Sequence, residues 1–292
     1  MIYVVGSVNL DYVARMRDLP RPGETVLGVD LQKNPGGKGA NQALAARRAG
    51  ADVRLIGCIG DDEDGVAATA LLAEAGVDLT GLAKTDATTG IAMIQIDAAG
   101  ENSIAVLPGA NALVTAAAVE GALAGLRSED FVVIQQEIPQ DATRAAISAA
   151  RAAGATSVLN IAPVLPGSAE LAREADIVVA NETEFACLST AEPSLAAAFD
   201  WCDETGRKLA LTLGSEGAIF AGESTPLHAR PPKINPLDTV GAGDTFVGYL
   251  AACLHARRSG EQALDTAVRA SAQACLTSGA QIAIPRMDEL RI

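Results

Sequence analysis

The chain has 292 residues, of which 49% are hydrophobic and 20% are charged, and this composition is ordinary for a globular protein with a sizeable core. Its formal net charge of −14 argues against binding to nucleic acid or to an anionic membrane, because basic patches bind both of these surfaces. A phosphorylated ligand is not excluded, since a local cluster of N–H donors can overcome a distant negative field.

The five cysteines are odd in number, lie far apart and form no CxxC pair, so we expect free thiols in a reducing compartment. No apolar run approaches the roughly 18 residues that a membrane span needs, and no signal peptide precedes the first apolar segment. We therefore expect a soluble cytoplasmic protein.

Short β-branched segments alternate along the chain with longer segments rich in Ala and Leu. The former predict buried strands at residues 2–5, 53–58, 131–135, 157–160, 177–179 and 209–213. The latter predict helices at residues 41–49, 65–75, 116–126, 141–153, 182–188, 195–205, 243–256 and 262–277. Strands that are apolar on both faces are typical of parallel sheets covered by helices, so the pattern predicts an α/β fold with a Rossmann-like, mostly parallel sheet between two helical layers.

Two regions, at about 10–35 and 88–106, interrupt this alternation. They mix polar and apolar residues and contain the turn Ala99-Gly100-Glu101-Asn102, which favours antiparallel strands. The two regions could pair in space as a small antiparallel β lid over a site. Alternatively, they are two unrelated surface hairpins.

Two polar segments near the N-terminus could bind a sugar. Asn9 and Asp11 follow the first strand and point the same way, so they could bracket a vicinal diol. In Gly36-Gly37-Lys38-Gly39-Ala40-Asn41, backbone N–H, ammonium and amide groups suit the hydroxyls of a sugar. The plainer interpretations are a polar loop for the first segment and a glycine-rich helix entry for the second.

Two later strand ends could serve a nucleotide and its metal ion. Asn181 and Glu184 follow the strand at 177–179 and suit a hydrated Mg²⁺, although a helix cap with an acidic first turn explains the same residues. Thr212, Gly214 and Gly217 end the strand at 209–213, where they could line a nucleotide or simply form a hairpin.

The segment "LDTVGAGDTF" (237–246) carries the clearest chemistry. The backbone N–H groups of Gly241, Ala242 and Gly243 lead into an apolar helix and can cradle an anion. Asp244, a carboxylate, stands beside this cradle, where it is unfavourable unless it removes a proton from a hydroxyl that attacks a bound phosphate. An ordinary strand-to-helix turn capped by Asp244 is the alternative.

An ordered set of motifs resembles the ribokinase/PfkB family of carbohydrate kinases from residue 4 to about residue 285. The motifs are "GSVNLD" (6–11), "PGETV" (22–26), "GGKGANQALAA" (36–46), "GCIGDDEDG" (57–65), "PGAN" (108–111), "QQEIP" (135–139), "NETE" (181–184), "TLGSEG" (212–217) and "DTVGAGDTF" (238–246). The resemblance implies a ribokinase-like single kinase domain over residues 1–292, with its lid at about 10–35 and 88–106. It also implies ATP-dependent transfer of phosphate to the 5-hydroxyl of D-ribose, which gives D-ribose 5-phosphate.

The resemblance assigns roles to individual residues. Asp244 is the implied general base, and Gly241, Ala242 and Gly243 form the implied anion hole. The implied sugar contacts are Asn9, Asp11, Gly37, Lys38, Asn41, Glu137 and Asp244. The implied contacts to ATP, Mg²⁺ and the phosphates are Asn181, Glu184, Thr212, Gly214, Gly217 and Gly243.

Family members of this type also use a monovalent cation, usually K⁺, and pair through their lids into a homodimer. Here the implied K⁺ ligands are Asp238, Thr239, Gly279 and Ala283. Two positions depart from the family pattern. Ala283 stands where Ser is frequent, which concerns the cation site, and Ser271 stands where His or Asn commonly flanks the adenine.

Several other functions compete with this interpretation. A kinase for another sugar or for a nucleoside would keep the same motifs, but a nucleoside pocket needs aromatic residues, and Tyr12 is the single aromatic residue in the lid sequence. A catalytically silent sugar-binding regulator would have lost Asp244 or the glycines before it. A dinucleotide-dependent oxidoreductase is excluded, because Phe246 occupies the place of the last glycine of GxGxxG.

Overall fold

Over residues 1–223 and 225–291, which the computed structural model describes, the central sheet contains nine strands. Their order is β13-β12-β11-β10-β9-β8-β1-β4-β5; β11 to β5 run parallel, and β12 and β13 form an antiparallel hairpin at one edge. The strands are β1 (Ile2–Val5), β4 (Val53–Gly60), β5 (Asp78–Thr85), β8 (Phe131–Ile134), β9 (Thr156–Asn160), β10 (Ile177–Asn181), β11 (Lys208–Thr212), β12 (Ala218–Ala221) and β13 (Leu227–Ala229).

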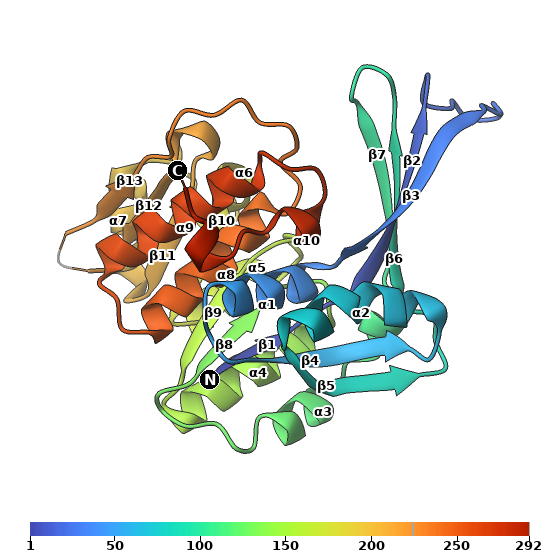
Figure 1. Cartoon of the computed structure of the whole chain (residues 1–292). Coiled ribbons are helices and arrows are strands. Elements are labelled where there is room, and N and C mark those ends of the chain that lie inside the picture. The colour runs from blue at the N-terminus through green and yellow to red at the C-terminus, as the bar shows by residue number, and fades with distance from the viewer. Residues whose placement is uncertain (224, 292) are drawn as a thin grey trace.

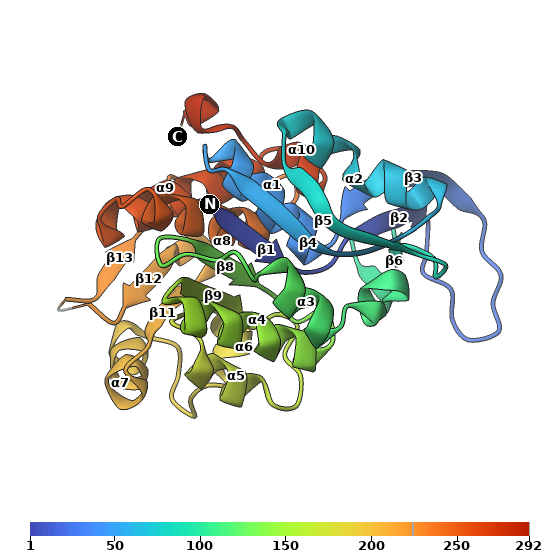
Figure 2. The same cartoon turned by 90° about the horizontal axis from the view of Figure 1, so that it is seen from below.

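Helices cover both faces of this sheet, as the sequence predicted (Figure 2). One layer contains α1 (Lys38–Arg48), α2 (Glu63–Ala75), α8 (Ala242–His255) and α9 (Gly260–Ala274), with the short α10 (Ala280–Ala283) beside it. The other contains α3 (Ala116–Ala122), α4 (Gln140–Ala153), α5 (Ser168–Glu174), α6 (Glu182–Phe185) and α7 (Leu195–Thr205). Side chains alternate along β1, so that Ile2 and Val4 enter the first core and Tyr3 and Val5 the second.

All six predicted strands and all eight predicted helices overlap elements of the structure. The sequence analysis missed β5, α5 and the β12–β13 hairpin. Edge strand β5 is half-exposed and contains Thr and Lys residues, so it lacks the uniform apolar pattern by which the other parallel strands were found. Helix α5 is seven residues long, which is too short for a clear helical period.

A second sheet of four strands projects from the body beside α2, with the order β3-β2-β6-β7 (Figure 1). These strands are β2 (Asn9–Met16), β3 (Gly28–Gly36), β6 (Gly90–Ile96) and β7 (Asn102–Leu107). The two regions that interrupted the helix–strand alternation therefore pair in space, and the interpretation as two unrelated hairpins is wrong. Each hairpin is antiparallel within itself, but β2 and β6 pair in parallel, because both leave the body from the same end.

All five cysteines are free thiols, as expected. Among the described residues, no helix combines the length and the apolar character that a membrane crossing requires.

Helices α1 and α8 pack against each other at unusually close range around Gly248 of α8. A β-carbon at this position would lie 2.5 Å from Ala45 Cβ, 2.7 Å from the Gln42 carbonyl oxygen and 2.8 Å from the Ala46 nitrogen. None of these atoms can rotate away, since they belong to backbone or to an alanine. The crossing therefore requires glycine at position 248, and it sets the distance between the first turns of the two helices.

Substitution Gly248→Ala should lower the free energy of unfolding by about 1–3 kcal/mol, because the added methyl group overpacks the crossing. Alanine normally stabilises a helix relative to glycine by about 0.5–1 kcal/mol, so the expected sign is opposite to the propensity effect. Urea denaturation measures the free energy of unfolding of the variant and of the wild type. The matched control is Gly121→Ala in α3, where no atom lies within 4 Å of the new methyl group and the variant should be at least as stable as the wild type. Equal behaviour of the two variants would contradict the close crossing.

Candidate active site

The N-terminus of α8 forms an anion-binding site at the end of a tight loop. Gly241 precedes the helix with φ at 76°, and a β-carbon there would lie 2.9 Å from Ala280 Cα, so both the conformation and the space require glycine. The first N–H groups of a helix have no acceptors within it, and the helix dipole adds partial positive charge at this end. The N–H of Ala242 donates to the Thr239 carbonyl oxygen at 3.2 Å, so this turn favours an anion through the N–H of Gly243 and the partial positive charge of the helix end.

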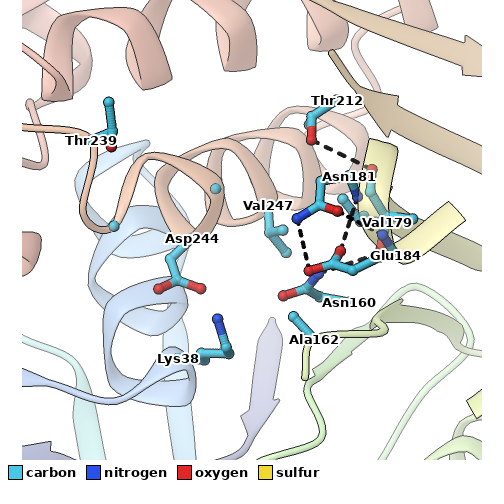
Figure 3. Close-up of a pocket in the computed structure, with 13 residues that line it drawn as sticks. Lys38, Asn160, Ala162, Val179, Asn181, Glu184, Thr212, Thr239, Asp244 and Val247 are labelled. Atoms are coloured by element: carbon cyan, nitrogen blue, oxygen red, sulfur yellow. Dashed lines mark hydrogen bonds between the residues drawn. The ribbon is translucent and has the colours of Figure 1, made fainter. Parts of the chain in front are cut away.

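Asp244, in the first turn of α8, is buried and held by two amides from α1. Asn41 Nδ2 donates to Asp244 Oδ2 over 2.9 Å, and Gln42 Nε2 donates to Asp244 Oδ1 over 2.8 Å. Lys38 extends toward the same carboxylate (Figure 3), and the negative charge of Asp244 raises the pKa of its ammonium group. The carboxylate thus has neutral donors on both oxygens and a cation nearby.

The structure brings the other predicted sugar contacts together beside Asp244. Asn9 Oδ1 accepts a hydrogen bond of 2.7 Å from Asn111 Nδ2, and this amide bond fixes the direction of the Asn9 side chain. Glu137 Oε2 accepts bonds from Ser7 Oγ at 2.5 Å and from the backbone N–H of Lys38 at 3.0 Å. The predicted sugar-binding residues therefore come from β2, from the start of α1 and from the loop after β8.

Two further observations indicate that this cluster is built for a polar ligand. Gly37 begins α1 with φ at 86°, and a β-carbon there would lie 2.7 Å from the Asn9 nitrogen, so the backbone of α1 closes directly onto β2. Asn41 Oδ1 is buried and has no hydrogen-bond partner within the described part of the chain. A buried acceptor of this kind is costly unless a ligand donates to it.

Among the acids of the cluster, Asp11 has the carboxyl group whose pKa is raised most. Burial, together with the negative charges of Glu137 and Asp244, raises the pKa of its carboxyl group to about 7. Gly36 lies against this carboxylate, and a β-carbon at position 36 would collide with it. Asp11 is therefore held in a confined position where a hydrogen bond from a ligand hydroxyl would favour its ionised form.

Two adjoining cavities extend from Asp244 along the carboxyl ends of the strands. The smaller has a volume of about 230 Å³ and is lined by Lys38, Asn181, Glu184, Gly241, Gly243 and Asp244, among others (Figure 3). The larger has a volume of about 740 Å³, and its lining includes Gly214, Gly217, Phe246, Ser271 and Cys275. Both cavities touch Thr212, Thr239 and Gly243, so they meet at the start of α8. The turn after β11 both forms a hairpin and lines the larger cavity.

Asn181 and Glu184 form a capping box at the start of α6. Asn181 Oδ1 accepts from the Glu184 nitrogen at 2.7 Å, and Glu184 Oε2 accepts from the Asn181 nitrogen at 2.9 Å. The helix-cap interpretation of these residues is therefore correct as far as their own contacts go. Burial raises the pKa of the Glu184 carboxyl group, which lines the smaller cavity. No cluster of three or more His, Cys, Asp or Glu side chains suited to a metal ion occurs in the described part of the chain, so a Mg²⁺ ion here would need ligands from phosphates and water.

The residues implied for a monovalent cation lie on two loops joined by Asp238. Its carboxylate accepts from the Val240 nitrogen at 3.0 Å and from the Gly279 nitrogen at 2.9 Å, and thereby ties the loop before α8 to the loop before α10. Ala283 is buried at the end of α10. Oxygen atoms of a carboxylate and of backbone carbonyls are hard ligands, so the donor types fit an alkali cation.

The sequence analysis did not assign roles to several residues that hold the site together. Asn111 and Gln135 lie in the motifs "PGAN" and "QQEIP", and Gln42 lies in "GGKGANQALAA", so motif membership was the available signal. Ser7 and Asn160 end or follow strands β1 and β9. Several of their contacts join distant segments, for example Gly39 to Ser7 over 32 residues and Gln42 to Asp244 over 202 residues, and such pairings cannot be read from spacing.

Comparisons with known proteins identify the family of this chain. The model of the pfkB carbohydrate kinase family matches residues 1–287. A ribokinase of Staphylococcus aureus is 38% identical over 299 residues, which cover 99% of this chain and 98% of that protein. The crystal structure of a ribokinase from Thermotoga maritima has a TM-score of 0.89 at 29% identity, covering 99% of this chain and 97% of that one. The structure of an Arabidopsis thaliana ribokinase complexed with ribose and ATP has a TM-score of 0.87 at 27% identity, covering 99% and 96% of the two chains. The chain belongs to the pfkB family of carbohydrate kinases.

Proposed function

We propose that this protein transfers the γ-phosphoryl group of ATP to the 5-hydroxyl of D-ribose and releases D-ribose 5-phosphate and ADP. The observation that carries the proposal is the position of Asp244, a buried carboxylate at an anion-binding helix N-terminus, between a polar cluster suited to a sugar and a large cavity suited to a nucleotide. The relatives named ribokinase, and the Arabidopsis structure complexed with ribose and ATP, support the choice of substrates.

In the proposed reaction, Asn9, Asp11, Gly37, Lys38, Asn41 and Glu137 hold the sugar hydroxyls through hydrogen bonds. Asp244 accepts the proton of the 5-hydroxyl while the oxygen attacks the γ-phosphorus. The bond from that phosphorus to the bridging oxygen of ADP breaks, and ADP leaves with the electron pair. The N–H groups of Gly241, Ala242 and Gly243 stabilise the charge on the transferring phosphoryl group. Because Asp244 takes up the proton in this step, its charge beside the phosphate becomes part of the chemistry.

The nucleotide is proposed to occupy the larger cavity, beside Thr212, Gly214 and Gly217. Ser271 Oγ donates to the Ala242 carbonyl at 2.9 Å, so this serine braces the first turn of α8 where relatives carry a residue that flanks the adenine. Asn181 and Glu184 would hold Mg²⁺ through water, since their direct contacts form the capping box. When bound, Mg²⁺ would neutralise charge on the phosphates.

We further propose that K⁺ binds at the Asp238 loops, near Thr239, Gly279 and Ala283, and strengthens the anion site indirectly. Asp238 already connects the two loops through the bond from Gly279, and Gly241 packs against Ala280. A cation bound there would fix the loop that precedes the first N–H groups of α8. Ala283 lacks the hydroxyl group of the serine that is frequent at this position in the family. The proposed K⁺ ligands there are therefore backbone carbonyl oxygens.

We propose that the whole chain works as one kinase domain and that the four-stranded sheet is its lid, which also joins two copies into a homodimer. Support comes from large apolar side chains that the lid leaves exposed: Leu27, Val29 and Leu31 are 90%, 80% and 60% exposed, and Met93, Ile104 and Val106 are each at least 50% exposed. Large apolar side chains exposed in such number on a four-stranded sheet favour a contact with another surface. We place the activity in the cytoplasm, where ATP is present and free thiols stay reduced.

A nucleoside as acceptor is disfavoured by the contacts of Tyr12. Its hydroxyl donates to Asp64 Oδ2 on α2 at 2.7 Å, and Lys33 lies 4.5 Å from the centre of its ring. The single aromatic ring in the lid is therefore engaged with groups on the lid and on α2 rather than free to stack on a base.

A silent sugar-binding regulator is disfavoured because Asp244 and the anion site are intact.

The proposal is tested by measuring ADP release with ATP and Mg²⁺ over ribose, deoxyribose, fructose, ketodeoxygluconate, adenosine and pseudouridine, each with and without K⁺. We expect the highest kcat/KM on ribose and stimulation by K⁺. A different preferred acceptor would retain the proposed chemistry and overturn the choice of ribose. Binding of ATP without turnover of any acceptor would favour the regulator.

Substitution Asp244→Asn should lower kcat by about 10²-fold or more, because the amide cannot accept the proton. Ribose binding, measured by calorimetry, should fall far less than kcat, since the amide keeps the size of the carboxylate and loses only one of the two bonds from Asn41 and Gln42. The control is Asp203→Asn on the exposed face of α7, which should behave as wild type. Full activity of the Asp244 variant would rule out its assignment as the base.

The affinity for ribose should depend on pH through Asp11. Its carboxyl group ionises as pH rises through about 7, and the ionised form accepts sugar hydrogen bonds more strongly. The KM for ribose should therefore fall by about tenfold between pH 6 and pH 8, while the KM for ATP stays constant. In Asp11→Asn the KM for ribose should be higher and independent of pH. The control Asp18→Asn, on an exposed part of the lid, should keep the dependence; its loss there, or its persistence in Asp11→Asn, would contradict the assignment.

A further inference from the structure

Gln42 is a fully buried glutamine. Both hydrogens and the oxygen of its side-chain amide have hydrogen-bond partners. Its Nε2 donates one hydrogen to Asp244 Oδ1 at 2.8 Å and the other to Asn160 Oδ1 at 3.1 Å. Its Oε1 accepts from Gln135 Nε2 at 2.6 Å. Neighbouring Asn41 donates to the other oxygen of Asp244, but its own Oδ1 lacks a partner, which leaves it free for a ligand. Gln42 has no such free atom and faces the protein interior.

The partners of Gln42 fix which end of its amide faces Asp244. A carboxylate can only accept, so Nε2 must point toward Asp244, and Oε1 must then point toward the donor from Gln135. Asn160 is itself oriented, because its Nδ2 donates to the Val179 carbonyl of β10 at 3.2 Å. Gln135 is confined by Gly6, where a β-carbon would collide with Gln135 Oε1. A row of three buried amides therefore connects the ends of β8 and β9 to Asp244.

Charged groups also act on Asp244. Lys38 faces it from the start of α1, and the acids Asp11 and Glu184 face it from β2 and α6. The charges of these groups have opposite signs, so their effects on Asp244 partly cancel. The amide of Gln42 instead contributes a fixed dipole with no net charge. A hydrogen bond donated to an ionised carboxylate favours that ionised form and restrains its rotation.

We propose that Gln42 is a positioning residue for Asp244, held by Gln135 and Asn160 so that its amide always donates to the carboxylate oxygen that Asn41 does not bind. This inference rests on the proposed function, in which Asp244 is the general base. In this role Gln42 fixes the rotation of the Asp244 carboxylate before the sugar arrives, and the unpartnered Oδ1 of Asn41 is left for the sugar. Gln42 and Gln135 support Asp244 from the protein interior, whereas Asn160, which holds the other hydrogen of the Gln42 amide, also lines the smaller cavity.

The first test is Gln42→Met, which preserves the length of the side chain and removes its donors. At saturating ribose, the acid limb of the kcat–pH profile should move up by about one pH unit, because Asp244 loses a donor to its ionised form. The plateau kcat should fall by about tenfold, since the carboxylate is free to rotate. The KM for ribose should stay within about threefold, because Gln42 does not face the sugar.

The matched control is Gln136→Met. Gln136 is also buried and also loses several hydrogen bonds, to the Ile161 and Pro163 carbonyls and to Ser168, but none of them reaches Asp244. The acid limb of the kcat–pH profile of Gln136→Met should stay in place even if the free energy of unfolding of this variant falls. Equal displacement of the acid limb in both variants, or none in Gln42→Met, would overturn the proposal.

A second variant and a second measurement keep the test independent of folding and of the proposed function. Gln135→Met removes the group that orients Gln42 and should displace the acid limb in the same direction by a smaller amount. Titration of ¹³C-labelled aspartate by NMR, with the Asp244 signal identified by its loss in Asp244→Asn, should show a higher midpoint in Gln42→Met than in the wild type. If no acceptor is phosphorylated, the proposed function fails, while an unchanged NMR midpoint would overturn the role of Gln42 by itself.

Discussion

Helix α8 crosses α1 at Gly248, where α8 has no side chain and packs directly on Ala45 and the backbone of α1, and the geometry of Asp244 depends on that contact. The crossing brings the first turn of α1, with Asn41 and Gln42, alongside the first turn of α8. Hydrogen bonds weaken steeply with distance and angle, so a small separation of the helices would release the carboxylate before it changed the fold. Stability and chemistry are therefore governed by one packing constraint.

The site concentrates acids in a chain that is already acidic. Asp11, Glu137, Glu184 and Asp244 gather around Lys38, and their mutual repulsion contributes to the raised pKa of Asp11. The neutral amides of Asn41 and Gln42 bind both oxygens of Asp244, and Lys38 supplies a positive charge nearby. An acid that only binds sugar tolerates a pKa near 7, whereas a general base needs donors that hold its orientation.

Residue patterns located most of the elements because the parallel strands are buried on both faces and their helices are long. They failed where that signal was weak, at the half-exposed edge strand β5, the seven-residue α5 and the short β12–β13 hairpin. The lid regions were predicted to pair, and they do, but the parallel pairing of β2 with β6 was not predicted, because register depends on where both strands leave the body. The strand-end positions of Asn181 and Thr212 were correct, since the carboxyl ends of parallel strands meet at one edge, whereas Asn9 begins β2 and does not end β1.

By itself the sequence determined the fold class, the glycine-rich turn before α8 and the carboxylate within its first turn, because these depend on local periodicity and on neighbouring residues. Its ordered motifs also indicated the family. Only the tertiary structure decided that Gln42 contacts an aspartate 202 residues away, that Asn160 and Gln135 complete the same row, and that Asn181 and Glu184 bind each other. The reason is physical: hydrogen bonds between buried groups form wherever packing brings donors and acceptors together, and packing joins segments without regard to their separation along the chain.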